Sequence, residues 1–522
     1  MAVSSEAIEF VSKHDYFSRF TTKALDGTDH IDTPFDAIIN QALDKTFTGE
    51  ITRLIINIPP GYGKCSHEDA IVLTRRGYIP AREVVVGDEF CSFAEGRAVW
   101  SRCLSLEVFE KPCITVKTRT GREYTASYDH PIKTQRGWTK LQELKVDEHY
   151  AVTFSGALEY GRSVPAAELD LVTLLLFEGG CSGYGTKFTS ADSEVVDVMR
   201  SACKALGMSL NLSKNSEIDY SIVGCRLEST KTGRSARGMP VAIAREIRRK
   251  YGIDGLAKDK KFPRQFDNLP LEQRWRFIGL MLATDGWITK NSSQLGVTIA
   301  SKSIAEGCQR LLASCGVPSA IYRKNNDHAG AWEVIVSAAY GEYVGKNVDA
   351  LQKQYLFEGF SSKTRQSYVD SYPAEVFGGG SRSRDIAAGI RTDSLKRQIT
   401  RGRWAQIVAA YPEYEDRTLE DFHYDVIREK KAAGVQRVIH FEVEGTQNYV
   451  CSGIVTHNTA KAVWAYVARG FAINPTSRFI HTSYSDKLVQ DNSSKIRDLI
   501  GHHDYGLMYP YVTFKELSLI HI

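Results

Sequence analysis

The sequence predicts a multidomain protein in which an all-β unit surrounds an α+β unit, and both interrupt an α/β unit. Residues 65–155 and 421–458 contain short alternating segments separated by turns, a pattern typical of an all-β unit. Residues 165–365 are mixed, with two apolar helical segments that are each followed by strand-like stretches. Residues 1–64 and 459–522 alternate between helix and strand, which indicates a split α/β unit.

The composition favours a globular protein of several domains. The chain has 522 residues, of which 43% are hydrophobic and 25% charged, and its net charge of +4 is close to neutral. Any nucleic-acid contact must therefore come from local basic patches. The ten cysteines include no CxxC pair, which argues against a zinc ribbon and suits a reducing cytoplasm. Because no signal pattern and no run of about 18 apolar residues is present, we expect a cytoplasmic protein without membrane contact.

The two flanks together encode one phosphate-binding loop, which the insert divides. Removal of residues 65–458 joins the flanks as Ile-Pro-Pro-Gly-Tyr-Gly-Lys-Thr, where the last two residues are Lys64 and Thr459. The apolar run Arg53–Ile58 reads as a buried strand before this loop, and residues 460–471 read as a helix after it. A loop of this kind between a strand and a helix is the P-loop arrangement that binds nucleotide phosphates.

Three residues of the divided loop are candidate nucleotide ligands. Gly63 would contribute a backbone amide, Lys64 would reach the outer phosphates, and Thr459 would ligate magnesium. Because they lie on both sides of the insert, ATP and Mg²⁺ are expected only in a complete host whose flanks have been joined. Residues 459–522 contain no hydrophobic strand that ends in paired acids, so this chain is not expected to hydrolyse ATP.

The residues at the ends of the insert predict that it removes itself. The Cys65 thiol can attack the carbonyl carbon of Lys64 and turn the amide into a thioester. Thr459 can then take over the acyl group as an ester, and Asn458 can cyclise onto its own carbonyl and release the insert. The ester relaxes to an amide that joins Lys64 to Thr459, and no cofactor is needed.

Two histidines could move the protons that these steps require. His457 is adjacent to Asn458, and His130 in the stretch Ser127-Tyr-Asp-His130 could protonate the amide nitrogen that leaves at Cys65. Alone, a cysteine is usually a small core residue, and a His-Asn pair is usually a surface feature. Their place at the two ends of a cut that restores a phosphate loop favours the catalytic interpretation.

Several stretches of the insert resemble the sequence blocks of the intein (Hint-fold) family. They are Cys65–Thr74 with Val86–Asp88, Tyr124–Ile132, Phe441–Thr446 and Cys451–Asn458. The resemblance implies one all-β splicing domain built from both β segments. Ser127 stands where the family has a threonine and keeps its hydroxyl group, whereas His440 replaces the usual acid and Gln447 a frequent histidine.

The two apolar helical segments, Leu171–Gly179 and Ile278–Gly286, resemble the helices of LAGLIDADG homing endonucleases. Two such helices can pack side by side and bring Glu178 and Asp285 together to hold Mg²⁺ over the scissile phosphates. The resemblance implies two tandem half-domains of the ααββ type. Lys260 stands where family members often carry a catalytic lysine. The alternative is a pair of core helices that each end in an acid and a glycine.

Residues 366–420 read as a linker that also contains a basic stretch. Seven arginines and lysines lie between Arg382 and Arg403, and only Asp385 and Asp393 oppose them. Such a stretch could contact the backbone of double-stranded DNA, although a solvated linker explains it equally well.

The flanks resemble the large terminase subunit of tailed phages in the stretches Gly49–Pro60 and Ser483–Val489. This family is an ATPase motor with a separate nuclease domain. The resemblance implies that residues 1–64 and 459–522 are the two exteins of a truncated, phage-encoded packaging protein in a bacterial cytoplasm, with phage packaging proteins as partners.

The leading interpretation is a self-splicing intein with a Mg²⁺-dependent DNA endonuclease, whose target is the uninterrupted host gene. One alternative is an insert that splices but only binds DNA. The other is a P-loop ATPase with an insertion that does not process itself.

Overall fold

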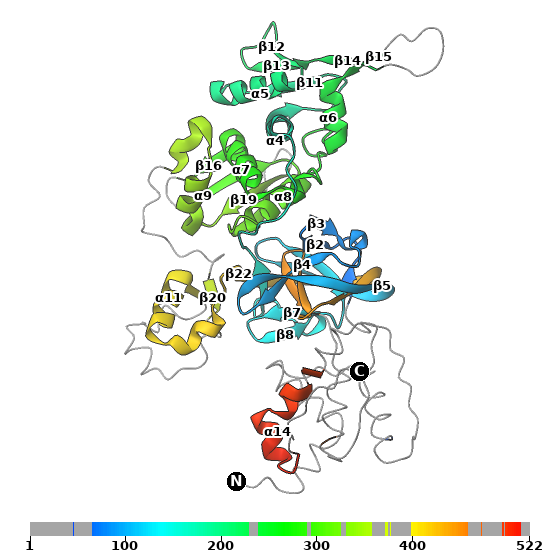
Figure 1. Cartoon of the computed structure of the whole chain (residues 1–522). Helices are drawn as coiled ribbons and strands as arrows, with labels where there is room; N and C mark the ends of the chain where they lie inside the picture. The colour runs from blue at the N-terminus through cyan, green and yellow to red at the C-terminus, as the bar shows by residue number, and fades with distance from the viewer. Residues whose placement is uncertain are drawn as a thin grey trace, which may run out of the picture.

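The structure is a computed structural model that describes residues 45, 65–228, 239–289, 294–324, 330–357, 371–373, 376, 398–457, 471, 493–494 and 496–512. Figure 1 shows an all-β domain in the middle, a helical and β region above it and a smaller unit at its side. In the described part of the two flanks, the short helix α14 (His503–Met508) is the main element. None of the described helices is long and apolar enough to cross a membrane.

The all-β domain is organised around two long antiparallel strands, β5 (Arg97–Thr118) and β22 (Phe422–Val443). Strand β1 (Ser66–His67) pairs with β22 on one side and with β6 (Glu123–Ser127) on the other, and β6 pairs back onto β5. The four strands therefore close on themselves, with Cys65 at the entry of β1. This closed arrangement is possible because one chain segment supplies β1, β5 and β6 and the other supplies β22.

The remaining strands of the domain also come from both segments. They are β2 (Ile71–Thr74), β3 (Gly77–Pro80), β4 (Glu89–Ala94), β7 (Pro131–Thr134), β8 (Gly137–Lys140), β9 (Tyr150–Phe154), β23 (Asn448–Cys451) and β24 (Ile454–His457). The two segments share one core, in which the Phe90 ring lies 5.3 Å from that of Phe441 and 5.4 Å from that of Tyr449. The prediction of a single all-β unit made of two separate segments is thus confirmed.

The region between the two β segments consists of two halves with the same order of elements. The first half is α4 (Ala166–Glu178), β10 (Gly179–Gly180), β11 (Thr186–Thr189), α5 (Ser193–Ala205), β12 (Ser209–Leu212) and β13 (Asp219–Val223). The second is α7 (Leu271–Asp285), β16 (Gly286–Ile288), β17 (Leu295–Ile299), α8 (Lys302–Ala313), β18 (Ser319–Lys324) and β19 (Ala331–Val336). Both sheets follow one topology, β10-β11-β13-β12 and β16-β17-β19-β18.

The order within each half is αββαββ, which corrects the predicted ααββ type. The difference arises because an amphipathic helix, α5 or α8, separates two hairpins and covers one face of the sheet. Side chains cap the starts of these helices. The Asp192 carboxylate accepts hydrogen bonds from the first backbone N–H groups of α5, and the Ser301 hydroxyl accepts one from the N–H of Ile304 in α8. Connecting elements are β14 (Cys225–Glu228), β15 (Met239–Ala242), α6 (Ile243–Tyr251), η3 (Phe266–Asn268), α9 (Gly341–Asn347) and η5 (Leu351–Phe357).

The described part of residues 366–420 folds against the all-β domain, which differs from the predicted linker. It contains β20 (Ser371–Pro373), β21 (Gln398–Thr400), α11 (Arg401–Ala410) and the 3-10 helix η8 (Pro412–Arg417). The rings of Tyr372 and Trp404 stack at 4.5 Å, and Tyr372 also contacts Tyr424 of β22 at 5.7 Å. Arg401 donates to the carbonyl oxygens of Leu419 and Phe422, so its role in this structure is to hold the unit together.

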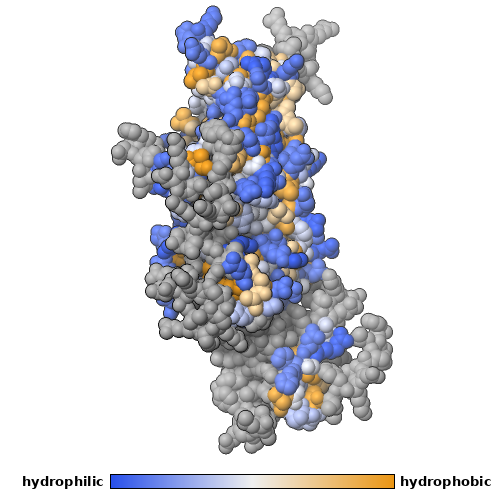
Figure 2. All heavy atoms as spheres, turned by 90° about the vertical axis from the view of Figure 1, so that its left-hand side faces the viewer, coloured by the Kyte–Doolittle hydropathy of each residue, from blue (hydrophilic) through white to orange (hydrophobic). Residues whose placement is uncertain are grey.

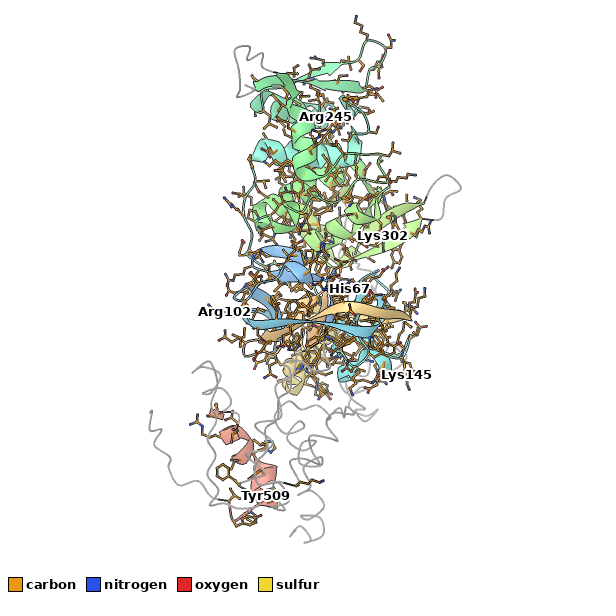
Figure 3. The ribbon with its side chains drawn as sticks, turned by 90° about the vertical axis from the view of Figure 1, so that its right-hand side faces the viewer. His67, Arg102, Lys145, Arg245, Lys302 and Tyr509 are labelled. Atoms are coloured by element: carbon orange, nitrogen blue, oxygen red, sulfur yellow. The ribbon has the colours of Figure 1, made fainter. Side chains whose placement is uncertain are left out.

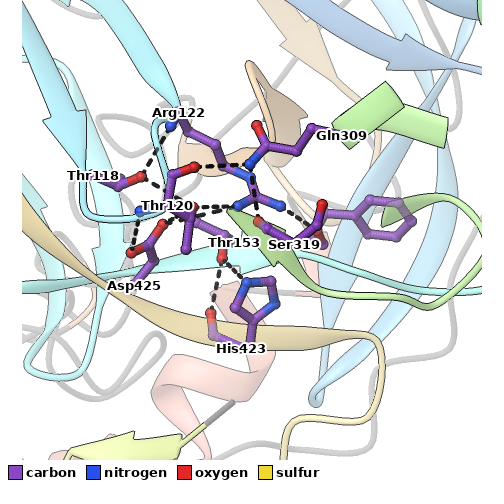
Figure 4. Close-up of polar contacts among 9 residues, drawn as sticks. Thr118, Thr120, Arg122, Thr153, Gln309, Ser319, His423 and Asp425 are labelled. Carbon is purple, nitrogen blue, oxygen red and sulfur yellow. Dashed lines mark hydrogen bonds and ion pairs between the residues drawn. The ribbon is translucent and has the colours of Figure 1, made fainter. Parts of the chain in front are cut away.

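A buried polar seam joins the two-half region to the all-β domain (Figure 4). Arg122 and Asp425 form a buried ion pair at 3.8 Å in the β-domain, and the Thr120 hydroxyl binds both side chains. Gln309 of α8 reaches across to the carbonyl oxygen of Thr120. At the edge of the seam Lys302 forms an ion pair with Glu123 at 3.4 Å, and Figure 3 shows Lys302 at the end of its region nearest the β-domain.

Candidate functional site

Cys65 lies fully buried at the start of β1, where Ser127 holds its backbone on both sides. The Cys65 N–H donates to Ser127 Oγ at 3.2 Å, and the Cys65 carbonyl oxygen accepts from the Ser127 N–H at 3.0 Å. The thiol packs in a cluster with Cys113 and Val438. Burial raises the pKa of Cys65 to about 12, although the nearby Lys111 ammonium group acts against this rise. The thiol is therefore protonated at neutral pH, and its attack on a carbonyl requires a base.

His130 lies between β6 and β7 and is fully buried. Its Nε2 is 2.8 Å from the hydroxyl group of Tyr124, and its backbone N–H donates to the Ser127 carbonyl oxygen at 3.0 Å. Ser127 therefore links the backbones of Cys65 and His130. The sequence indicates that Ser127 and His130 act at Cys65, but it does not indicate which hydroxyl group binds Nε2 of His130.

His457 is the last residue of β24, and its ring lies 4.6 Å from that of Trp138. Strand β24 pairs antiparallel with β7 through Thr456 and Ile132, so the chain beyond Thr456 runs towards His130. The two histidines predicted to act at opposite ends of the insert thus lie at the same end of one strand pair. Gly63, Lys64, Asn458 and Thr459 lie outside the described residues, as do the predicted strand Arg53–Ile58 and basic residues 382–397.

Glu178 and Asp285 are the last residues of α4 and α7, which pack side by side in one core, with the rings of Phe177 and Phe277 5.9 Å apart. Burial is the main cause that raises the pKa of Glu178 to about 7; a hydrogen bond from Ser190 acts against this rise, and the charge of Asp285 adds a smaller part of it. Burial likewise raises the pKa of Asp285 to about 6. Such raised pKa values mean that the charged form of each carboxylate is destabilised, and a cation bound between the two acids would stabilise it.

The environment of the two acids fits a divalent metal ion. Oε2 of Glu178 is buried and has no hydrogen-bond partner among the described residues, so it can bind a cation without losing another contact. The described residues contain no cluster of three or more His, Cys, Asp or Glu side chains that could hold a metal. A cation at this site would have two protein carboxylates, and its other ligands would come from water or a phosphate.

A lysine lies at the carboxyl end of each of the two acid-bearing helices. Lys260 is 1% exposed, and its Nζ donates to the carbonyl oxygens of Leu175, Leu176 and Gly179 at 2.5, 3.2 and 2.7 Å. Lys353 donates to the Thr284 carbonyl oxygen and, at 3.3 Å, to that of Gly286. Both positive charges lower the pKa of Asp285. Lys353 is not predicted from the sequence; the repeat of the two halves is the signal that points to it, since Lys353 contacts the end of α7 as Lys260 contacts the end of α4.

The exposed side of the first half carries both hydrophobic and charged residues. Tyr184 is 84% exposed, and the Arg245 guanidinium group lies 4.6 Å from the centre of its ring. Leu212 and Val223 of the neighbouring strands are about half exposed. Figure 2 shows hydrophilic and hydrophobic side chains side by side over this part of the molecule, and Figure 3 shows the position of Arg245.

Comparison with known families and proteins identifies one part of the chain directly. Residues 272–344 match the model of a LAGLIDADG-like domain, and this range contains α7 from its second residue to Asp285, α8 and the second sheet. The chain therefore contains a LAGLIDADG-like domain, and the prediction of that resemblance is confirmed for the second half.

Curated relatives with similar sequences are replicative DNA helicases named DnaB. The protein from Rhodothermus marinus is 23% identical over 438 residues, which cover 76% of this chain and 46% of the helicase. That from Nostoc sp. (strain PCC 7120) is 23% identical over 443 residues, which cover 76% of this chain and 49% of the helicase. This chain thus matches about half the length of these curated relatives.

Solved structures with some likeness are inteins of DnaB proteins. A Ssp DnaB mini-intein variant is 9% identical, covers 76% of this chain and 95% of its own and has a TM-score of 0.24. A DnaB intein from Synechocystis sp. PCC 6803 is 18% identical, covers 17% of this chain and 67% of its own and has a TM-score of 0.16. At these TM-scores the fold described above rests on the strand pairing of this chain alone.

Proposed function

We propose that residues 65–458 are a self-splicing intein that carries a LAGLIDADG-type DNA endonuclease. The observation that carries this proposal is the position of the two ends of the insert. Cys65 enters the all-β domain in β1 and His457 leaves it in β24, although the whole two-half region lies between them in sequence. The all-β domain thus holds both ends of residues 65–458, and this arrangement is suited to joining the two flanks.

The first step is the attack of the Cys65 thiol on the carbonyl carbon of Lys64. Because burial keeps this thiol protonated, the attack needs a base, and His130 is the proposed group. Ser127 holds the Cys65 backbone in place through two hydrogen bonds, while the Lys111 charge favours the developing thiolate. The proton then passes to the Cys65 nitrogen as the peptide bond breaks.

The later steps use the residues at the second junction. Thr459 takes the acyl group from Cys65, and Asn458 cyclises and releases the insert, with His457 as the proposed proton donor or acceptor. The ester that joins Lys64 and Thr459 then rearranges to an amide. The joined flanks would restore Gly63, Lys64 and Thr459 as a P-loop, which supports the proposal that the host is a terminase large subunit that binds ATP and Mg²⁺ when complete.

The endonuclease would hold Mg²⁺ between Glu178 and Asp285 and cut double-stranded DNA at the uninterrupted host gene. The metal ion would supply charge to the scissile phosphate and activate a water molecule. Lys260 and Lys353 place two positive charges near the same acids, so the site favours a phosphate backbone over a neutral ligand. The match of residues 272–344 to a LAGLIDADG-like domain supports this second activity.

The splicing proposal is tested by the masses of the products after expression of the full chain. Splicing predicts a free insert of residues 65–458 and a joined product of residues 1–64 and 459–522. The double variant Cys65→Ala with Asn458→Ala should remain at full length. A wild-type chain that also remains at full length would support the alternative of an insertion that does not process itself.

The endonuclease proposal is tested on DNA that contains the host gene without the insert. We expect the wild-type protein to cut it only when Mg²⁺ is present, and Glu178→Gln or Asp285→Asn to bind the DNA without cutting. Specific binding without cutting by the wild-type protein would favour the alternative of an insert that only binds DNA.

A further inference from the structure

The indole ring of Trp138 lies against the imidazole ring of His457 at the end of β24. The two ring centres are 4.6 Å apart and the ring planes meet at 65°, which is an edge-to-face contact. Aromatic pairs of this kind have centres about 4.5–7 Å apart, so this contact is at the close end of the range. His457 is only 8% exposed, so protein groups, with the indole among them, cover most of its side chain.

The pairing of three strands places the two rings on one face of the sheet. Trp138 of β8 lies opposite Lys133 of β7, and Thr456 of β24 lies opposite Ile132 of β7. Side chains alternate between the two faces of a strand, so the next residues after this second pair, His457 and Lys133, share the other face. Trp138 shares that face too, because it lies opposite Lys133. The contact between Trp138 and His457 therefore follows from the register of β8, β7 and β24.

The indole ring is itself held in place by its surroundings. The Lys133 ammonium group lies 5.0 Å from the centre of the Trp138 ring and 5.7 Å from that of the Phe93 ring. A cation at this distance is attracted to the electron-rich face of an aromatic ring. Trp138 also packs against the buried cluster that contains Val455, which is two residues before His457 in β24. The imidazole thus rests on a side chain that is fixed from several directions.

The step proposed for His457 requires an imidazole with a fixed orientation. In this step the side-chain nitrogen of Asn458 forms a bond to its own backbone carbonyl carbon, and the bond from that carbon to the Thr459 nitrogen breaks. The side-chain nitrogen loses one proton and the Thr459 nitrogen gains one, so no proton is gained or lost overall. An imidazole can carry this proton only when its nitrogen comes within about 2.6–3.2 Å of the reacting groups.

We propose that Trp138 is a positioning residue that holds the imidazole of His457 in the orientation that this step needs. The proposal rests on the splicing function proposed above and adds a residue that acts at the second junction. The edge-to-face contact limits the rotation of the imidazole, so the ring is already oriented when the bonds change. No local pattern of the sequence points to Trp138, because only the strand pairing brings it to His457.

The rate at which residues 459–522 are released tests the proposal. In a full chain with Cys65→Ala the first junction is blocked, and only cleavage after Asn458 releases these residues. Trp138→Leu removes the ring and should slow this release by about 10- to 100-fold, since a small displacement of a catalytic group has effects of this size. Trp138→Phe keeps an aromatic ring and should restore the rate to within about threefold of that of the Cys65→Ala chain.

Trp100→Leu is the matched control for Trp138→Leu. Both tryptophans are partly buried against the same cluster, and the Trp100 ring also lies near a cation, 5.1 Å from the Arg75 guanidinium group. Its edge-to-face contact is with Tyr160 at 6.2 Å instead of with His457. Both leucine variants should lower the melting temperature by similar amounts, but Trp100→Leu should slow the release less than about threefold. Equal slowing by the two variants would overturn the proposal.

The first junction provides a readout that a loss of folding would change as well. In an Asn458→Ala chain, which keeps the first junction intact, thiol-induced cleavage at Cys65 reports on that junction alone. Trp138→Leu should slow this cleavage less than about threefold, because the contact with the indole is made by the histidine of the other junction. Equal slowing at both junctions would mean that Trp138 is only structural.

NMR of the histidine rings tests the contact without any reaction. In a histidine-labelled chain with Cys65→Ala and Asn458→Ala, the ring signals of His457 are identified by their loss in His457→Gln. They should move in Trp138→Leu and stay in place in Trp100→Leu. Signals that do not move in Trp138→Leu would refute the proposal even if the wild-type chain splices. Failure of the wild-type chain to splice, with the signals moved as expected, would instead count against the splicing function.

Discussion

Gln309 donates from Nε2 to the carbonyl oxygen of Thr120 at 2.9 Å, and this buried contact joins the LAGLIDADG-like domain to the all-β domain. The same Gln309 amide donates to the Ser319 carbonyl oxygen at 2.9 Å, and the Ile321 N–H also donates to the Thr120 carbonyl oxygen at 2.9 Å. The turn that contains Thr120 is therefore held from above by α8 and β18 and from below by Asp425. Buried polar groups of the two domains are hydrogen-bonded to each other, so we expect the two domains to unfold together.

Gly121 in this turn tests the contact between the domains. Its φ of +90° is in the left-handed region, and a Cβ atom there would lie 2.9 Å from the Ile321 carbonyl oxygen. Gly121→Ala should lower the free energy of unfolding by about 2–3 kcal/mol, because it adds a clash to the backbone strain. Gly87→Ala is the matched control, since Gly87 has a φ of +95° but nothing within 4 Å of the new Cβ.

Gly87→Ala should cost only the backbone strain of about 1–2 kcal/mol. Differential scanning calorimetry of both variants gives the melting temperatures and the number of transitions. Equal losses for the two glycines would show that the Ile321 contact has no energetic importance.

The features that the sequence could predict are those that depend on local pattern. Alternating segments with turns marked the β-domain, and apolar helices that end in an acid marked α4 and α7, because each pattern lies within a few residues. The stacking of Tyr372 on Trp404 and the buried contacts of the Ser66 hydroxyl with those of Tyr124 and Tyr449 could not be predicted. They join residues that are far apart in the sequence, and a single tyrosine or serine has no local pattern that names its partner.

The pKa values of Glu178 and Asp285 predict how stability depends on pH. Both values are raised in the folded protein, so their contribution is fully present below about pH 4, the usual value for such acids, and is lost as the pH rises through about 6 for Asp285 and about 7 for Glu178. Without divalent cations, the free energy of unfolding should fall between about pH 4 and pH 7 by about 1–2 kcal/mol, after allowance for solvent screening.

Urea denaturation with and without Mg²⁺ checks this prediction. The variant Glu178→Gln with Asp285→Asn should be more stable than the wild type at pH 8, and Mg²⁺ should stabilise only the wild type. A pH dependence that is unchanged in the double variant would show that other groups cause it.

Lys260 should matter more for stability than Lys353. Lys260→Met would leave the carbonyl oxygens of Leu175, Leu176 and Gly179 without their buried donor, which should cost about 2–3 kcal/mol. Lys353 is only partly buried and has two such contacts, so Lys353→Met should cost about 1 kcal/mol. Urea denaturation separates the two values, and a larger loss for Lys353→Met would contradict the prediction.

Asp425 should be the most sensitive residue of the seam between the domains. Asp425 and Arg122 are 3% and 6% exposed, and burial raises the pKa of Asp425 and lowers that of Arg122, so each charge depends on its partner. Asp425→Ala would leave the Arg122 charge buried and the Thr120 hydroxyl without its acceptor, at a cost of about 3–5 kcal/mol. Removal of both charges by Arg122→Met with Asp425→Leu should cost clearly less than the sum of the single changes, because no charge is then left unpaired. A double-mutant cycle of unfolding free energies measures this coupling, and strictly additive losses would show that the two charges act independently.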